Sequence, residues 1–151
     1  MATNVTISNG LAWSADNSTM YYVDSPTRCV DAFDFDPFTG SIAHRRTVIE
    51  VMEGAPDGMC IDDAGNLWVA LWGGWSVACF DPSTGAQIGK IDVPVEAVTS
   101  CCFGGSRWDE LYITTASRDL DAGGRTQQPL AGSVFRANPG ITGPPTQLFV
   151  A

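Results

Sequence analysis

Two polar residues, each followed by a glycine and a short apolar segment, are the strongest candidates for a functional site. Asn9 precedes Gly10-Leu11-Ala12-Trp13, and Asp57 precedes Gly58-Met59-Cys60-Ile61. Amide and carboxylate oxygens are the ligands that hard divalent cations such as Ca²⁺ prefer. A carboxylate can also serve as a general base, so Asp57 is predicted to be a metal ligand, a catalytic base or both. Asn-Gly and Asp-Gly are also common in turns, which leaves a purely structural role as the alternative.

Other reactive residue types do not form a second centre. His44 is the only histidine and lies in the polar segment Ala43-His44-Arg45-Arg46, where we expect a solvated surface and no catalytic triad. Cys101 and Cys102 should point to opposite faces of a strand, and neither has a histidine to activate it. Thr99 and Ser100 occupy the corresponding place in a third, looser copy of the pattern and are expected to be structural.

Several acidic and aromatic residues are expected to have structural roles in turns or in packing. The acids expected to belong to ordinary turns are Asp16, Asp62, Asp63, Asp81 and Asp109. The tryptophans expected to pack mainly between repeats are Trp68, Trp72 and Trp75, of which Trp72 is close enough to the predicted site to touch a ligand. The glycines that follow Asn9 and Asp57 are expected to let neighbouring backbones approach closely.

A repeat of about 45 residues organises the chain. The turns that begin at Asp36 and Asp81 are nearly identical and 45 residues apart, and the landmarks Tyr22, Trp68 and Tyr112 are spaced by 46 and 44 residues. Four short strands in such a period are typical of a β-propeller blade. The prediction is an all-β, single partial β-propeller domain over residues 1–151. Its three four-stranded blades would span about 8–54, 55–94 and 95–151, with twelve strands, essentially no helix and a surface loop at Ser117–Ala131.

Within those blades the strands are predicted from apolar runs bounded by turn residues. The first blade is expected to contain Gly10–Trp13, Thr19–Asp24, Cys29–Asp34 and Ser41–Val51, and the third to end with Gly132–Ala137 and Thr146–Val150.

Composition narrows the class of partner. Eight basic and 17 acidic residues give a net charge of −9, which argues against nucleic acid because phosphate backbones are bound by clustered Lys and Arg. No apolar run approaches the ~20 residues of a membrane helix, so no membrane partner is expected. Five cysteines at irregular spacing, without a recognisable signal sequence, favour a reducing, cytoplasmic location.

Taken in order, these motifs resemble the senescence-marker protein/gluconolactonase (regucalcin-like) family. The resemblance implies a six-bladed propeller with one divalent metal in its channel, Ca²⁺ foremost, with Zn²⁺, Mg²⁺ or Mn²⁺ as alternatives, and a small-molecule lactone as substrate. It places a metal-ligating Asn on Asn9 and a metal-ligating Asp on Asp57. The motifs that carry it are Ile7-Ser8-Asn9-Gly10-Leu11-Ala12-Trp13, Tyr21-Tyr22-Val23-Asp24-Ser25, Pro56-Asp57-Gly58-Met59-Cys60-Ile61-Asp62, Leu67-Trp68-Val69-Ala70 and Thr99-Ser100-Cys101-Cys102-Phe103-Gly104-Gly105.

The resemblance covers the C-terminal half of such a propeller. The family's remaining ligand, a Glu, and its substrate-holding Arg and Asn belong to blades that this sequence does not contain, so its substrate-binding residues are not assigned. We therefore expect a metal-dependent sugar lactone hydrolase that is impaired as a half-length chain. The alternatives are a non-catalytic calcium-binding or interaction module, and a truncated isoform or incomplete gene model. Open blade edges are expected to favour self-association.

Overall fold

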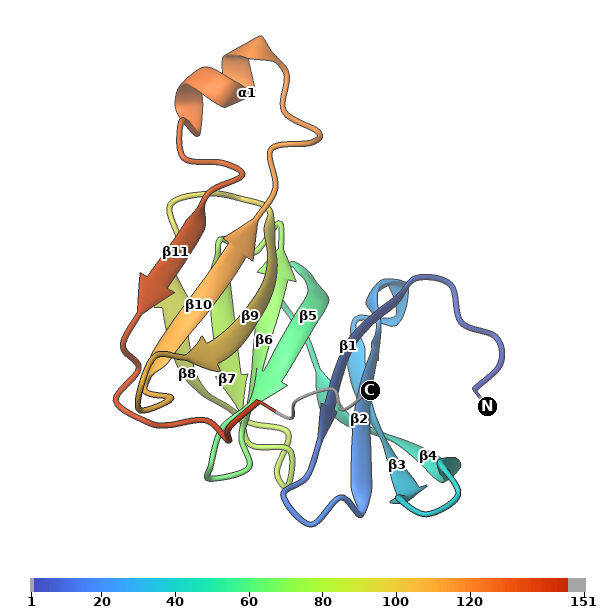
Figure 1. The fold of residues 1–151 in the computed structure, drawn as a ribbon. Coiled ribbons are helices and arrows are strands. Elements are labelled where there is room, and N and C mark those ends of the chain that lie inside the picture. Colours follow the sequence, from blue (N-terminus) through green and yellow to red (C-terminus); the bar gives the residue numbers. More distant parts are fainter. Residues whose placement is uncertain (1, 147–151) are drawn as a thin grey trace.

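The computed structural model describes residues 2–146 and consists of three antiparallel sheets (Figure 1). The first sheet has the order β1-β2-β3-β4 and the second the order β5-β6-β7-β8, so each strand pairs with its neighbour in sequence. Their bounds are β1 Ser8–Trp13, β2 Thr19–Asp24, β3 Cys29–Asp36, β4 Ser41–Glu50, β5 Ala55–Ile61, β6 Leu67–Trp72, β7 Ser76–Phe80 and β8 Gln87–Asp92. Two four-stranded meanders were predicted from the sequence, and both are confirmed.

The third sheet contains β9 (Val98–Gly104), β10 (Glu110–Thr115) and β11 (Val134–Ala137), in the order β11-β10-β9. The strand predicted at Gly132–Ala137 therefore begins two residues later. The last predicted strand, Thr146–Val150, lies outside the described residues except for Thr146, which is not in a strand.

The turns that join the third and fourth strands explain the repeat. The Asp36 carboxylate accepts hydrogen bonds from the Phe38 N–H (2.9 Å) and the Thr39 hydroxyl (2.6 Å). Asp81 accepts the same two bonds from Ser83 and Thr84. The Ser83 hydroxyl also donates to Asp81, at 2.7 Å. It has the largest effect among the hydrogen bonds that stabilise the ionised carboxylate and so lower the pKa of Asp81. The equivalent acids thus build one turn in both sheets.

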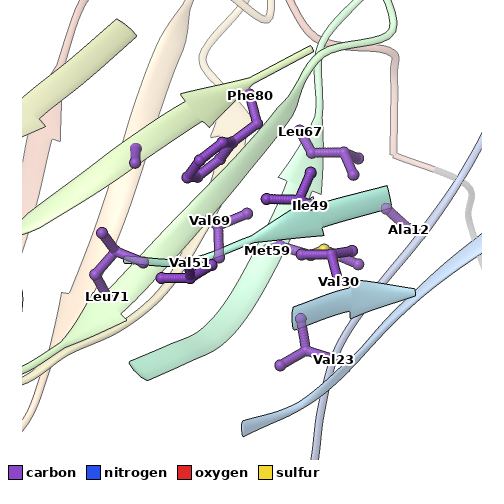
Figure 2. Packing of buried hydrophobic residues seen from close by; sticks show 11 residues of the cluster. Ala12, Val23, Val30, Ile49, Val51, Met59, Leu67, Val69, Leu71 and Phe80 are labelled. Carbon is purple, nitrogen blue, oxygen red and sulfur yellow. The ribbon is translucent and has the colours of Figure 1, made fainter. Parts of the chain in front are cut away.

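The two larger hydrophobic clusters each lie between two sheets, as expected of adjacent blades, and a smaller third cluster lies on the first sheet around Met20, Tyr22 and Phe33. The first cluster joins sheets one and two and includes Val23, Val30, Ile49, Leu67 and Val69, all essentially inaccessible to solvent (Figure 2). A second cluster joins sheets two and three, where Trp68 meets Phe103 edge to face at 6.1 Å between ring centroids. The inter-blade role predicted for Trp68 is confirmed. The same prediction was wrong for Trp75, which has a left-handed φ of 54° and is 42% exposed.

Two short helical segments interrupt the all-β pattern, and the prediction of essentially no helix needs this correction. A 3₁₀ turn, η1, spans Ser25–Thr27, and α1 spans Ala122–Gln127 within the insertion that was predicted to be a loop. Asp121 caps α1 by accepting a hydrogen bond from the Gly124 N–H at 2.7 Å, which offsets the low helix propensity of two glycines. Among residues 2–146, no helix has the length and apolarity needed to cross a bilayer.

Cysteine and histidine positions follow the predictions. Cys101 is buried, with its Sγ 3.6 Å from that of Cys60, while Cys102 is exposed on the opposite face of β9. His44 is an exposed side chain whose Nδ1 lies 2.6 Å from an Asp34 carboxylate oxygen.

One turn acid proves to be part of the core. Asp62 is only 3% exposed and accepts hydrogen bonds from the Ala64 and Asn66 N–H groups, the Asn66 amide and the Trp68 indole N–H (2.9 Å). We expect Asp62→Ala to lower the free energy of unfolding by about 3 kcal/mol, because it leaves buried donors without acceptors. Urea denaturation would measure this loss. Asp16→Ala, in the exposed equivalent turn of the first sheet, is the matched control and should cost far less; equal losses would contradict the core role of Asp62.

Candidate metal site at the ends of the inner strands

The first strands of the three sheets, β1, β5 and β9, lie against one another at two glycines. A Cβ atom added to Gly10 would come within 2.7 Å of the Asp57 carbonyl oxygen and 2.8 Å of the Met59 Cγ. A Cβ added to Gly58 would come within 2.5 Å of the Ser100 Cβ and 2.9 Å of its Cα. Real side chains do not approach so closely, so both positions require glycine. The close approach expected from the Asn-Gly and Asp-Gly pairs is confirmed.

All three inner strands also change register at the same place. The pairing of β1 with β2 shifts between Ser8 and Leu11, and that of β5 with β6 shifts between Pro56 and Met59. In the third sheet the shift falls opposite Thr114 and Thr115, next to Thr99. A bulge removes a residue from the ladder and redirects its side chain. Asn9 and Asp57 are therefore held by a bulge at equivalent points of successive sheets.

Asn9 is oriented by groups at the end of β2. The buried Asp24 carboxylate accepts hydrogen bonds from the Thr6 and Ile7 N–H groups (3.1 and 2.8 Å) and so fixes the chain that enters β1. Next to it, the Ser25 hydroxyl oxygen accepts a hydrogen bond from the Asn9 Nδ2 at 3.1 Å. Because the amide nitrogen is used in this way, the amide oxygen is left as the potential ligand.

Asp57 is a half-buried carboxylate on the neighbouring strand. Burial raises its pKa, and hydrogen bonds from the Asn9 side chain and the Gly58 N–H partly oppose that rise. The ion pairs formed within residues 2–146 do not include Asp57. A partly desolvated carboxylate that has no protein cation beside it, and that adjoins the amide group of Asn9, is suited to binding a metal cation.

The third copy of the pattern adds no comparable ligand. The Thr99 hydroxyl lies 2.7 Å from that of Thr114 within its own sheet, and Ser100 packs against Gly58. Both therefore have the structural roles predicted for them. Within residues 2–146, three or more His, Cys, Asp or Glu side chains do not gather at any one point. The two oxygens of Asn9 and Asp57 fit a divalent cation in type, but they are few beside the 6–8 that Ca²⁺ prefers.

A family model matches most of the chain. Residues 1–117, which include both candidate ligands, match the SMP-30/Gluconolactonase/LRE-like region. The chain belongs to this family. Regucalcin of Gallus gallus is 48% identical over 148 residues, which are 96% of this chain and 50% of the chicken protein. Regucalcin of Bos taurus is 50% identical over 87% of this chain and 45% of its own length. The chain thus spans about half the length of the curated relatives it matches.

Solved structures of family members share its architecture. The luciferin-regenerating enzyme superposes with a TM-score of 0.85 at 38% identity, covering 93% of this chain and 48% of that one. A calcium-binding protein, regucalcin, from Agrobacterium tumefaciens gives 0.84 at 29% identity, with 92% and 47% covered. A gluconolactonase from Xanthomonas campestris gives 0.64 at 34% identity, with 76% and 36% covered. These relatives are β-propellers, so the three sheets described above are blades of that fold, as predicted.

Two other segments of the chain, the end of β6 and the insertion that contains α1, lie at the same end of the blades as Asn9 and Asp57. Trp72 ends β6, where it pairs with Ala55, and it forms an isolated bridge with Ala97 just before β9. The insertion that contains α1 rises above this end (Figure 1). The segment Asp24–Thr27 was predicted to lie beside Asn9, and the hydrogen bonds of Asp24 and Ser25 place it there, whereas the three bulges were not predicted. The repetition of a polar residue before each inner strand was the only sequence signal for the bulges.

Proposed function

We propose that Asn9 and Asp57 hold a divalent cation and that the site serves the hydrolysis of sugar lactones. The observation that carries the proposal is the pairing of an oriented Asn9 amide group with a half-buried Asp57 carboxylate at matching bulges of β1 and β5. Names of relatives support it, since one solved structure is described as a calcium-binding protein and another as a gluconolactonase. Ca²⁺ is the first choice, and Zn²⁺, Mg²⁺ and Mn²⁺ are the alternatives to compare.

The residues present suit the steps of lactone hydrolysis. When bound, a divalent cation supplies Lewis acidity that polarises a carbonyl group. Asp57 accepts a proton from the water that attacks the lactone carbonyl, and its raised pKa makes it a stronger base than an ordinary aspartate. The carbonyl carbon gains the water oxygen, its bond to the ring oxygen breaks, and the ring oxygen takes up a proton to give the hydroxy acid. The Asn9 amide is not ionisable, so it transfers no proton and serves only to bind and orient.

The test is hydrolysis of δ-gluconolactone by this chain, followed by acid release with and without Ca²⁺. We expect slow, Ca²⁺-dependent turnover that Asp57→Asn eliminates. The rate is expected to be low because positioning of the reactants contributes about 7–11 kcal/mol to such reactions, and the chain spans only half of its relatives. Asp92→Asn, at an 84% exposed carboxylate, makes the same charge change and should keep the wild-type rate. Equal rates in wild type and Asp57→Asn would contradict the assignment.

A second candidate is a non-catalytic calcium-binding module. It is favoured by the small ligand set, because only Asn9 and Asp57 come together and no cluster of three ligating side chains forms within residues 2–146. Saturable Ca²⁺ binding that depends on Asp57, without lactone hydrolysis at any Ca²⁺ concentration, would distinguish this function from the first.

We also propose that the chain forms a single domain. Residues 8–54, 55–94 and 95–151 would be three blades of one partial propeller domain. Self-association through open blade faces and a cytoplasmic location stay predictions; sedimentation velocity would test the former.

A further inference from the structure

A small cavity lies under the insertion, at the same end of the blades as Asn9 and Asp57. Its volume is about 170 Å³, room for about five or six water molecules at about 30 Å³ each. Its walls come from the end of β6, the segment before β9 and the insertion. The lining residues used below are Trp72, Glu96, Asp119, Leu120 and Gln128.

The insertion is fixed to the blade by hydrogen bonds. The Gln128 side-chain oxygen accepts a hydrogen bond from the Glu96 N–H at 2.7 Å, and Gln128 is only 8% exposed. The Ala116 N–H donates to the Ala97 carbonyl at 2.9 Å, where the insertion begins. The cavity is therefore bounded by a fixed segment, and Gln128 is the residue that positions it.

The bond to Glu96 also determines which end of the Gln128 amide faces the cavity. A backbone N–H can only donate, so it must face the amide oxygen, and the amide nitrogen is left over. Within residues 2–146 this nitrogen has no hydrogen-bond acceptor. Every fully buried polar side-chain atom in these residues has a partner, so the nitrogen must be accessible to solvent. Gln128 thus lines the cavity and keeps amide N–H groups that have no protein acceptor within the described residues.

The remaining walls supply the complementary groups. Glu96 and Asp119 are exposed acids whose carboxylate oxygens can accept hydrogen bonds, one Asp119 oxygen lying 3.6 Å from the Arg118 Nε, and Trp72 and Leu120 offer apolar surface. Hydroxyl groups both donate and accept, so they satisfy the carboxylates and the amide together. An anion would be repelled by the two carboxylates, whereas a hydroxylated ligand can use the carboxylates and the Gln128 amide at the same time. The combination of aromatic surface with a few convergent polar groups fits an uncharged, polyhydroxylated ligand.

We propose that this cavity binds the hydroxyl groups of a polyhydroxylated, sugar-derived ligand. Its identification with the hydroxylated part of the lactone rests on the function proposed above. The sheet register supports that link, because Trp72 pairs with Ala55, two residues before Asp57 on β5. Two residues of a strand span about 7 Å, a distance comparable to the length of a six-carbon sugar. Gln128 is a positioning residue for this subsite, and Trp72 provides the surface against which the ligand lies.

The test uses D-glucitol, an uncharged six-carbon polyol, with the whole chain in EDTA, so that its outcome does not depend on metal binding or hydrolysis. Two-dimensional ¹H–¹⁵N NMR would follow the Trp72 indole and Gln128 amide signals, with cyclohexanol as the ligand control. We expect saturable shifts at both signals with glucitol and none with cyclohexanol. Trp72→Ala and Gln128→Leu should each weaken binding at least tenfold. Gln127→Leu, at the exposed neighbouring residue, should leave binding unchanged.

The outcomes separate this inference from the proposed function. Glucitol shifts confined to the cavity, even in a chain that hydrolyses no lactone, support the subsite. Absence of saturable shifts at Trp72 and Gln128 overturns it, even if lactone is hydrolysed, and so does wild-type binding by Trp72→Ala. If Gln128→Leu disorders residues 117–131, Trp72→Ala decides the matter, because it leaves the Gln128–Glu96 bond in place.

Discussion

Asp57→Asn should abolish saturable Ca²⁺ binding by this chain without lowering its thermal stability at neutral pH. Wild-type binding is expected to be weak, with a dissociation constant of about 10⁻⁴ to 10⁻³ M, because Asn9 and Asp57 supply few of the oxygens that Ca²⁺ prefers. Removing the negative charge of Asp57 leaves only neutral ligands. Titration calorimetry would measure the loss, and thermal unfolding in EDTA would measure the stability.

The thermal stability of Asp57→Asn can be predicted from the direction in which the pKa of Asp57 is shifted. Burial raises the pKa of Asp57 above the usual value of 3.8. The folded state therefore favours the protonated carboxyl, and this contribution to stability is lost as pH rises from the unfolded to the folded pKa. At neutral pH the ionised carboxylate is a cost that the neutral amide of the variant would not carry. The unfolding midpoint of Asp57→Asn should therefore equal or exceed that of wild type.

The same shift predicts how binding depends on pH. Ca²⁺ requires the ionised carboxylate, so affinity should decline as pH falls through the folded pKa of Asp57, at a higher pH than for an ordinary aspartate. Asp92→Asn, which changes an exposed carboxylate, should keep both the affinity and the pH profile of wild type. An unchanged dissociation constant in Asp57→Asn would move the cation site elsewhere.

The elements that repeat could be predicted from the sequence. Asp36 and Asp81 open the same turn because their carboxylates accept the same local hydrogen bonds, so the pattern is visible without tertiary information. The apolar runs on either side then fix strands such as Thr19–Asp24, whose predicted and observed bounds coincide. Asn9 and Asp57 could be proposed for the same reason, since each precedes an apolar segment of an inner strand.

Features that depend on burial, or on where a particular partner group lies in the folded chain, could not be predicted. Asp62 has the sequence of an ordinary turn acid, and only the placement of the Trp68 indole over it makes it a buried acceptor. Helix α1 contains two glycines and forms because Asp121 caps it. Gln128 looks like any polar loop residue until its bond to Glu96 is seen. Trp75 was wrongly predicted to pack between blades because the sequence around a tryptophan does not show whether its side chain is packed in a core or exposed in a turn.

Gly58→Ala should produce a large loss of stability at the contact between β5 and β9. The added methyl group would lie 2.5 Å from the Ser100 Cβ and 2.9 Å from its Cα, so rotation of the Ser100 side chain cannot relieve the overlap. Overpacking of this kind costs about 1–3 kcal/mol or more. At about 3 kcal/mol, a chain of this size should unfold roughly 6–12 °C lower, which calorimetry or circular dichroism would measure.

Two further variants make the Gly58 prediction specific. Gly123→Ala lies in α1, where the added Cβ comes no closer than 3.4 Å to the Asp121 Oδ1, so its unfolding midpoint should not fall. Ser100→Gly removes the Cβ that Gly58→Ala meets, and the double variant should recover part of the loss, giving a coupling energy of about 1 kcal/mol or more. Because β5 also holds Asp57, separation of β5 from β9 in Gly58→Ala should weaken Ca²⁺ binding as well. Additive losses in the double variant would show that Gly58 and Ser100 do not meet in the folded chain.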